Sequence, residues 1–317
     1  MISERIVDME TNDFHVLLNK KAAECEAVLQ KFLPRQEGFA ERVIEAMNYS
    51  VLAGGKRLRP MLILETAAMY GAEPSMYEPF MAALEMIHTY SLVHDDLPAM
   101  DNDTLRRGRK TTWNVYGDGM AVIAGDGLLN LAYETTARAI ENAGSELQMR
   151  RGIRALNVLA RNAGIYGMVG GQCADIEAET RETLETASDE EKEALLVYIH
   201  ENKTAAMIRS GFQIGAILGG APEEDIEELG IIADRIGLAF QIQDDILDVT
   251  GSSEDLGKTI GKDAEEGKVT YVSLHGLEAA AEKVESLTRE ALEAMDRLHV
   301  QNDFLRELAL YLVVRSN

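Results

Sequence analysis

Two groups of aspartates could bind metal ions in this chain, and each group follows an apolar segment with helical spacing. Carboxylates held close together repel one another and lose hydration, and a hard divalent cation removes that cost. Mg²⁺ is usually bound by a few carboxylates and keeps its remaining positions for substrate phosphates. The pattern therefore predicts a diphosphate held by Mg²⁺ between the two groups. The aspartates are Asp95, Asp96, Asp101, Asp244, Asp245 and Asp248.

The second group has the spacing of one helix face. Asp248 is at i+4 from Asp244 and at i+3 from Asp245, so the three carboxylates are neighbours on a helix. One alternative is an acidic helix end exposed to water, but the flanking segments 240–243 and 246–247 are largely apolar. An EF-hand is another alternative, and the sequence lacks the loop glycine and final glutamate that an EF-hand needs.

The first group is interrupted by Pro98, which cannot continue the hydrogen-bond ladder of a helix. We therefore expect the helix that carries Asp95 and Asp96 to end or distort near the proline. Asp101 should then lie on an irregular continuation of the chain.

Two basic segments could bind phosphate. Arg106 and Arg107 follow the first aspartate group, and a guanidinium binds phosphate oxygens in a forked geometry. The segment 54–60 reads Gly-Gly-Lys-Arg-Leu-Arg-Pro, and its cations, without a nearby acid, favour an anion. It lacks the Lys-Ser/Thr ending of a P-loop. The alternatives are a surface Asp–Arg network and a solvated turn.

Single cations elsewhere in the chain are weaker signals. Lys203, Lys258 and Lys268 lie in polar or acidic segments, and each alone is more often a surface lysine than a ligand. His88 lies on the apolar segment that leads to the first aspartate group. Its imidazole could contact phosphate or metal, or it could simply pack within a helical core.

Apolar residues recur with helical spacing almost everywhere, for example at positions 226, 229, 233, 236 and 240. No segment shows a convincing alternation typical of a strand. The breaks between helices are short and contain no Gly/Ser-rich or Pro-rich linker. We therefore predict an all-α protein with a single domain over residues 1–317, its helices surrounding a deep core. The expected helices are 13–32, 38–53, 60–70, 76–96, 119–142, 145–163, 165–179, 189–219, 224–249, 269–277, 278–298 and 303–314.

Composition excludes some classes of function. The formal net charge is −23, from 54 acidic and 31 basic residues, which argues against general nucleic-acid binding. The two cysteines allow neither a disulfide framework nor a zinc site. No signal peptide and no apolar segment long enough to span a bilayer is visible. We expect a cytoplasmic protein.

Taken together, these motifs resemble the trans-isoprenyl diphosphate synthases, and among them the bacterial farnesyl diphosphate synthases most. The resemblance spans about residues 30–315. It rests on the two aspartate motifs with their flanks, the segments 54–60, 90–101, 167–172 and 256–268, and the pairs Arg106-Arg107 and Lys203-Thr204. A pair of such motifs is specific, whereas a lone Asp-Asp-x-x-Asp would be weak evidence.

The resemblance implies an all-helical isoprenoid synthase fold with a central cavity, usually in a homodimer. It implies head-to-tail condensation of an allylic diphosphate with isopentenyl diphosphate, without nucleic acid or a membrane span. The six aspartates would then hold Mg²⁺, three ions per site, around the allylic diphosphate. That diphosphate would also contact Arg106, Lys203, Thr204, Gln241, Lys258 and Lys268. Isopentenyl diphosphate would contact Lys56, Arg59, His88 and Arg107. The catalytic set would be Lys203, Thr204, Gln241, Asp95 and Asp244.

The resemblance also suggests what limits product length. In this family a bulky residue about one turn before the first aspartate motif blocks chain growth. Tyr90, with its neighbour Ser91, occupies that position, which favours a fifteen-carbon farnesyl product. A geranylgeranyl diphosphate synthase is the alternative. A non-catalytic partner subunit of another synthase is a further one, although such subunits tend to lose an aspartate motif and both are intact here.

Overall fold

The computed structural model describes residues 12–180, 187–250 and 269–314. The expected ligands Lys258 and Lys268 lie outside these residues. The chain divides into two compact units. The N-terminal unit comprises Asn12–Asn157 and Ile214–Gly220, and the C-terminal unit comprises Val158–Gln213 and the described residues from Ala221 onward.

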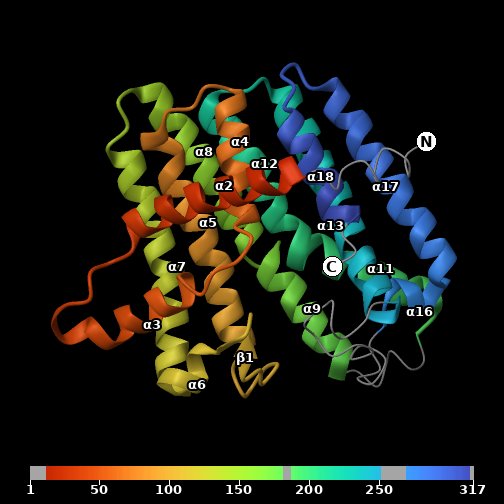
Figure 1. Cartoon of the computed structure of the whole chain (residues 1–317), viewed down its shortest axis with the longest axis horizontal. Coiled ribbons are helices and arrows are strands. Elements are labelled where there is room, and N and C mark those ends of the chain that lie inside the picture. Colours follow the sequence, from red (N-terminus) through yellow and green to blue (C-terminus); the bar gives the residue numbers. More distant parts are fainter. Residues whose placement is uncertain (1–11, 181–186, 251–268, 315–317) are drawn as a thin grey trace. The chain divides into compact units, whose positions relative to one another are not determined.

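The N-terminal unit is built around helix α5, which packs against α7 along much of its length (Figure 1). Helix α5 carries apolar side chains on all sides between Pro79 and Ile87, so it is buried between its neighbours. Phe80 and Leu84 are fully buried there, as is Leu128 of α7. The helices of this unit are α2 (Asn12–Phe32), η1 (Gly38–Ala40), α3 (Glu41–Val51), α4 (Leu58–Met69), α5 (Pro74–Asp95), α6 (Thr112–Tyr116), α7 (Asp118–Glu141) and most of α8 (Glu146–Ala163).

A short β-hairpin lies between α5 and α6, in a segment where the sequence shows no convincing strand pattern. Strands β1 (Leu105–Arg106) and β2 (Arg109–Lys110) pair antiparallel, with Arg106 opposite Arg109. The turn residues Arg107 and Gly108 both have positive φ, 53° and 73°, as a tight hairpin with right-handed strand twist requires. Strands of two residues are too short to show an alternating pattern, so periodicity could not reveal them.

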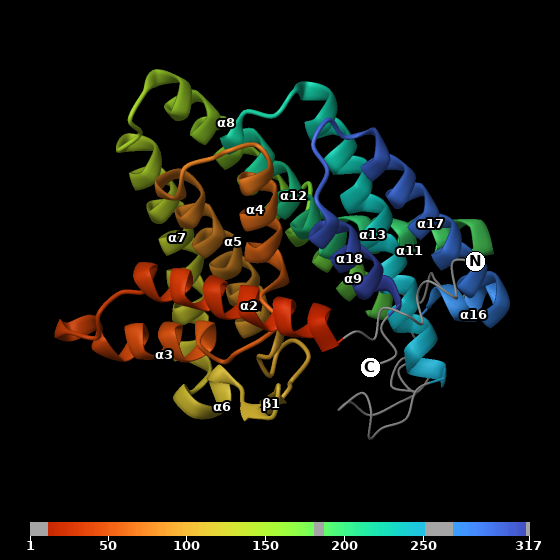
Figure 2. The same cartoon turned by 45° about the horizontal axis from the view of Figure 1, so that its top comes forward.

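The C-terminal unit is built around the long helix α13, which packs against α17 (Figure 2). Its core includes Leu238 and Ile242 of α13 and Leu287 of α17. Its helices are the end of α8, α9 (Met168–Thr180), α11 (Asp189–Ile199), η2 (His200–Ala205), the first part of α12 (Ala206–Gly219), α13 (Glu223–Thr250), α16 (Tyr271–His275), α17 (Leu277–Arg297) and α18 (Asp303–Val314).

The all-α prediction is confirmed, since the hairpin contains the only strands in the described part of the chain. Most expected helices agree with the observed ones to within a few residues. The main difference is the expected helix 189–219, which a six-residue π-helix, His200–Ala205, divides into α11 and α12. No helix among the described residues combines the length and apolarity needed to cross a bilayer.

Candidate active site

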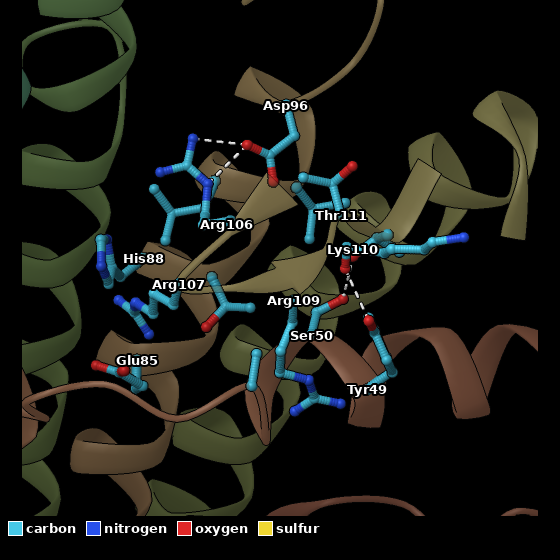
Figure 3. A pocket seen from close by; sticks show the side chains of 15 residues that line it. Tyr49, Ser50, Glu85, His88, Asp96, Arg106, Arg107, Arg109, Lys110 and Thr111 are labelled. Carbon is cyan, nitrogen blue, oxygen red and sulfur yellow. Dashed lines mark hydrogen bonds and ion pairs between the residues drawn. The ribbon is translucent and has the colours of Figure 1, made fainter. Parts of the chain in front are cut away.

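A pocket in the N-terminal unit gathers basic side chains from segments distant in sequence (Figure 3). Helix α5 contributes Glu85 and His88, the cap at its C-terminal end contributes Asp96, and the hairpin contributes Arg106 and Arg107. The same pocket is closed on another side by α3 and by the start of α6. The structure therefore brings part of the first aspartate motif together with the arginine pair that follows it.

Arg106 is bound to Asp96 inside this pocket. Its Nε and Nη2 atoms each lie 2.6 Å from Oδ1 of Asp96, and Nη2 lies 3.5 Å from Oδ2 of Asp103. The Asp96 side chain is buried, and burial raises its pKa despite the opposing effect of the Arg106 guanidinium. Arg106, which is expected to bind diphosphate, and Asp96, which is expected to bind metal, are thus paired with each other, and their charges cancel.

The hairpin turn directs Arg107 onto the glycine-rich segment 54–60. Its Nη1 atom donates to the carbonyl oxygen of Gly54, and its guanidinium lies directly over Gly55. A Cβ atom at Gly55 would overlap that guanidinium, and Gly55 also has a φ of 136°, so only glycine fits there. The two basic segments seen in the sequence are therefore parts of one site.

Arg59 and His88 complete the basic group next to Arg107. Burial lowers the pKa of Arg59, and its Nε atom is buried without a hydrogen-bond acceptor among the described residues. Burial and the nearby guanidinium groups of Arg59 and Arg107 lower the pKa of His88 well below its usual value. His88 is therefore neutral at pH 7. A buried guanidinium with an unused donor indicates a binding site for an anion.

Lys56 was expected in the same group. It is exposed, and it lies at the tight turn that leads from Gly54 and Gly55 into α4. Arg57, the next residue, adopts a left-handed conformation with φ of 50°. The Arg57 guanidinium is buried and pairs with Glu26 and Glu85, whereas Lys56 is exposed.

The first aspartate motif has the expected break. Helix α5 ends at Asp95, and the chain then turns so that the amide of Asp101 donates to the carbonyl oxygen of Asp95 at 2.9 Å. The prediction that the helix ends near Pro98 is confirmed. Asp95 is half-buried and Asp101 is exposed.

The second motif lies on the last turns of the observed part of α13. Asp244, Asp245 and Gln241 are half-buried, and Asp248 lies one turn further along the same helix. Oδ2 of Asp245 accepts a hydrogen bond of 2.8 Å from the amide of Tyr271, at the start of α16. The helical spacing predicted for these residues is confirmed.

Lys203 and Thr204 lie on the π-helix of the C-terminal unit. A π-helix has a wider turn than an α-helix and interrupts the regular i→i−4 hydrogen bonds. Such π-helical turns are frequent at functional sites. Here two glycines allow it to pack closely: a Cβ at Gly171 would meet the backbone of Lys203, and a Cβ at Gly237 would meet Ala205. Lys203 is ion-paired with Asp175 of α9.

His200 begins this π-helix and is buried. Burial lowers its pKa to about 4, with Lys203 also lowering it and Asp175 opposing. Its Nδ1 atom is buried and has no hydrogen-bond partner in the described part of the chain. His200 is therefore a neutral histidine next to a residue expected to bind the allylic diphosphate.

The carboxylates fit a metal that shares its coordination with a ligand. Within residues 12–180, 187–250 and 269–314, no three His, Cys, Asp or Glu side chains converge closely enough to hold a metal ion by themselves. Mg²⁺ typically takes one or two carboxylates together with phosphate oxygens and water. The donor chemistry of the two motifs suits this mode of binding better than an all-protein cage.

Tyr90 and Ser91 lie on α5 before the first motif. Tyr90 is 8% exposed and packs edge-on against His94, with ring centroids 5.7 Å apart. Burial raises its pKa to about 12, and Tyr133 of α7 and Asp95 contribute. The hydroxyl of Ser91 donates to the carbonyl oxygen of His88 within the same helix.

Glu85 and Asp175, which reasoning from sequence did not single out, also contribute to these sites, and Arg57 of the segment 54–60 pairs with a carboxylate. Glu85 lines the basic pocket, Arg57 pairs with it, and Asp175 pairs with Lys203. Glu85 lies three positions before His88 and so on the same helix face, which was an available signal. The sequence offers no comparable signal for Asp175, because its partner is distant in the chain.

Comparison with known proteins identifies the class to which this fold and these motifs belong. The sequence profile described as Polyprenyl synthetase matches residues 40–304. The chain therefore belongs to the polyprenyl synthetase family, and it is a prenyltransferase of the trans-prenyl synthase type.

Individual relatives are named for different products. The farnesyl diphosphate synthase of Bacillus subtilis is 44% identical over 86% of this chain and 88% of its own length. The large subunit 1 of the heterodimeric geranylgeranyl pyrophosphate synthase of Arabidopsis thaliana is 41% identical over 100% of this chain and 86% of its own. A crystal structure of an FPP/GFPP synthase from Zymomonas mobilis has a TM-score of 0.81 and 32% identity, covering 95% of this chain and 99% of that one.

Proposed function

We propose that this prenyltransferase condenses isopentenyl diphosphate with dimethylallyl or geranyl diphosphate to give farnesyl diphosphate. The observation that supports the proposal most is the basic pocket beside the first aspartate motif. The pocket combines a neutral histidine with Arg106 and Arg107, and the guanidinium of Arg59, whose Nε is a buried, unused donor, acts on the same histidine. These groups suit a diphosphate that needs no metal of its own.

The two substrates would be bound by different groups of residues. Arg59, His88 and Arg107, with Lys56, would bind the diphosphate of isopentenyl diphosphate. Because His88 is neutral, it can donate one hydrogen bond without adding charge. The guanidinium groups supply the charge and the forked geometry.

The allylic diphosphate would be bound by the two aspartate motifs through Mg²⁺, together with Arg106, Lys203, Thr204 and Gln241. When bound, Mg²⁺ supplies the positive charge that a departing diphosphate needs. Arg106 and Lys203 would add hydrogen-bond donors to the same leaving group, which stabilises negative charge as it develops.

The reaction would depend on how the two substrates are positioned relative to each other. The allylic C–O bond breaks, the double bond of isopentenyl diphosphate attacks the allylic carbon, and the new tertiary cation loses a proton to the released diphosphate. A basic pocket that holds the second substrate near the allylic carbon makes this step effectively unimolecular. The widened turn at Lys203 and Thr204 offers backbone carbonyl dipoles that suit a cation, as does the Gln241 amide oxygen.

A fifteen-carbon product is the finer part of the proposal. Its support is the bulky, buried Tyr90 one turn before Asp95, together with the similarity to the B. subtilis farnesyl enzyme. The relative from A. thaliana and another from Catharanthus roseus are geranylgeranyl synthases by name, so that product is the second candidate. Both aspartate motifs and the basic pocket are intact, which favours a catalytic chain over a non-catalytic partner subunit.

A homodimer and a cytoplasmic location are further parts of the proposal. The homodimer is proposed from the family resemblance, and the location from the two cysteines, which suit a reducing compartment. Size-exclusion chromatography with light scattering tests the first, and fractionation of cells tests the second.

The central experiment incubates the purified protein with Mg²⁺, isopentenyl diphosphate and ¹⁴C-labelled geranyl diphosphate, followed by chromatography of the dephosphorylated products. Farnesol is the expected product. Geranylgeraniol as the main product would replace the farnesyl proposal with the second candidate. No condensation with any allylic diphosphate, by a folded protein, would contradict the proposed activity.

A further inference from the structure

Arg57 lies within the basic segment 54–60, and its guanidinium is held by two carboxylates and a backbone carbonyl. Its Nη1 atom lies 2.6 Å from Oε1 of Glu85, and its Nε lies 2.7 Å from Oε2 of Glu26. Its Nη2 donates to the carbonyl oxygen of Val51 at 2.5 Å. The side chains of Arg57 and Glu85 are only 2% and 4% exposed, so this is a buried ion pair.

These three contacts connect the turn that carries Arg57 to three helices of the N-terminal unit. Glu26 belongs to α2, Val51 ends α3, and Glu85 lies on α5. Arg57 holds them from a left-handed backbone conformation that a non-glycine residue adopts only at a cost of about 1 kcal/mol. The buried contacts therefore hold the turn in a shape that it would not adopt alone.

Glu85 also acts on the diphosphate-binding groups. Burial disfavours the charged forms of Arg59 and Arg107 and so lowers the pKa of each. The Glu85 carboxylate opposes this effect by favouring the charged form of both guanidinium groups. Glu85 lines the same pocket as His88 and Arg107, and Figure 3 shows it beside them. A carboxylate in an anion pocket repels the ligand, so its presence needs a reason that outweighs the repulsion.

We propose that Glu85 is a positioning residue for the second substrate. Through its buried pair with Arg57 it fixes the left-handed turn, and that turn presents Lys56 and Arg59 to the diphosphate of isopentenyl diphosphate. The inference rests on the proposed function and deepens it, because it assigns the residue that keeps this subsite in shape. Glu85 itself does not contact the substrate.

A purely electrostatic role predicts the opposite result. If Glu85 only balanced positive charge, neutralising it would strengthen the binding of an anion. If it positions the turn, neutralising it weakens binding at this subsite and leaves the allylic subsite unchanged. The sign of the change in KM therefore distinguishes the two roles.

The test compares steady-state kinetics of Glu85→Gln with those of the wild type. We expect the KM for isopentenyl diphosphate to rise at least tenfold, with the KM for geranyl diphosphate within twofold and kcat within threefold. Glu78→Gln is the matched control: it lies on the same helix and loses an exposed pair with Lys31, so both KM values should stay unchanged. An unchanged or lower KM for isopentenyl diphosphate, or equal rises in both KM values, would overturn the proposal.

A second variant covers the case in which Glu85→Gln does not fold. Glu26→Gln removes the other carboxylate from Arg57 at the more exposed side of the network, where Glu26 is 29% exposed. It should raise the KM for isopentenyl diphosphate about threefold and leave the KM for geranyl diphosphate unchanged. The same KM for isopentenyl diphosphate as in the wild type would contradict the proposed role of the network.

Calorimetry with inorganic pyrophosphate separates this inference from the proposed function. With EDTA present, pyrophosphate should bind the wild type, bind Glu85→Gln at least tenfold more weakly, and not bind Arg59→Ala. This pattern without any condensation activity would contradict the proposed function and leave the inference intact. Equal binding by wild type and Glu85→Gln, with condensation normal, would contradict the inference alone.

Discussion

The guanidinium of Arg106 and the carboxylate of Asp96 are bound to each other, with Nε and Nη2 both 2.6 Å from one oxygen of the carboxylate. The first residue is expected to bind the allylic diphosphate and the second to bind Mg²⁺. Both are preformed in the same pocket and neutralise each other there. If Mg²⁺ and a diphosphate bind here as proposed, Asp96 would exchange the guanidinium for a metal ion, and Arg106 would exchange the carboxylate for the diphosphate.

The first prediction concerns this pair. Arg106→Met removes the guanidinium and leaves Asp96 buried without its main cation, so the pKa of Asp96 should rise further and a protonated carboxyl binds Mg²⁺ poorly. We expect kcat/KM for geranyl diphosphate to fall about 10–100-fold, the value of one or two charge-assisted hydrogen bonds. The Mg²⁺ concentration for half-maximal activity should also rise, and this rise should grow as the pH is lowered. Arg106→Lys is the comparison variant, because lysine keeps the positive charge but lacks the two parallel N–H donors of the guanidinium. An unchanged Mg²⁺ requirement in Arg106→Met would contradict this account.

The second prediction concerns the aspartate motifs. Asp95→Ala and Asp244→Ala should each lower kcat by a factor of about 10³ or more, because each removes charge stabilisation of the leaving group. Both residues are half-buried and polar, so far-ultraviolet circular dichroism and the melting temperature should change little. Wild-type-like turnover of either variant at limiting Mg²⁺ would exclude its residue from the metal site.

Much of this fold could be predicted because the signals are local. Helical spacing of apolar residues predicted α13 within a residue or two of its observed limits, and Pro98 marked the end of α5. The second aspartate motif lies on one helix face because i, i+3 and i+4 positions are neighbours in any helix. These features need no knowledge of tertiary structure.

Other features depend on contacts between distant segments, so sequence patterns did not show them. The turn that aims Arg107 at Gly54 rests on two residues with positive φ in a hairpin too short to show alternation. The π-helix at His200–Ala205 follows α11 directly and continues directly into α12, so no break in the helical segment marks it. The pairing of Lys203 with Asp175 joins two helices that no spacing rule relates.

The third prediction concerns product length. If Tyr90 blocks the growing chain, Tyr90→Ala should lengthen the main product from fifteen toward twenty or more carbons. The substitution also removes a buried ring, which costs about 3–5 kcal/mol of unfolding free energy, so the assay belongs well below the melting temperature. Tyr90→Phe keeps the ring and is the control, with product length unchanged. An identical product distribution for Tyr90→Ala and wild type would remove Tyr90 from this role.

The fourth prediction concerns the stability of the protein in acid. The pKa of His200 is lowered to about 4 in the folded protein from an ordinary value of 6.5. Between these values the unfolded chain binds more protons than the folded one, so stability is fully present above pH 6.5 and falls as the pH drops toward 4. The loss attributable to His200 is at most about 3 kcal/mol.

His200→Gln tests this assignment, because glutamine does not titrate. The unfolding free energies of wild type and variant are measured by urea titration from pH 7 to pH 5. As the pH is lowered, the wild type should lose more unfolding free energy than the variant. Other titrating groups cancel in this difference. A difference that is constant over this range would show that His200 titrates normally in the folded state.

The fifth prediction concerns the glycine that supports the π-helix. A methyl group at Gly171 would overlap the backbone of Lys203, and backbone cannot rotate away as a flexible side chain could. Gly171→Ala should therefore displace Lys203 and Thr204 and lower kcat/KM for geranyl diphosphate at least tenfold, with a fall in melting temperature. Gly119→Ala is the matched control, since a methyl group on this residue of α7 meets nothing within 4 Å. In a helix that change should stabilise the protein by up to about 1 kcal/mol and leave activity unchanged. If Gly171→Ala retains full activity, the π-helix does not need close packing against α9 to hold its lysine in place.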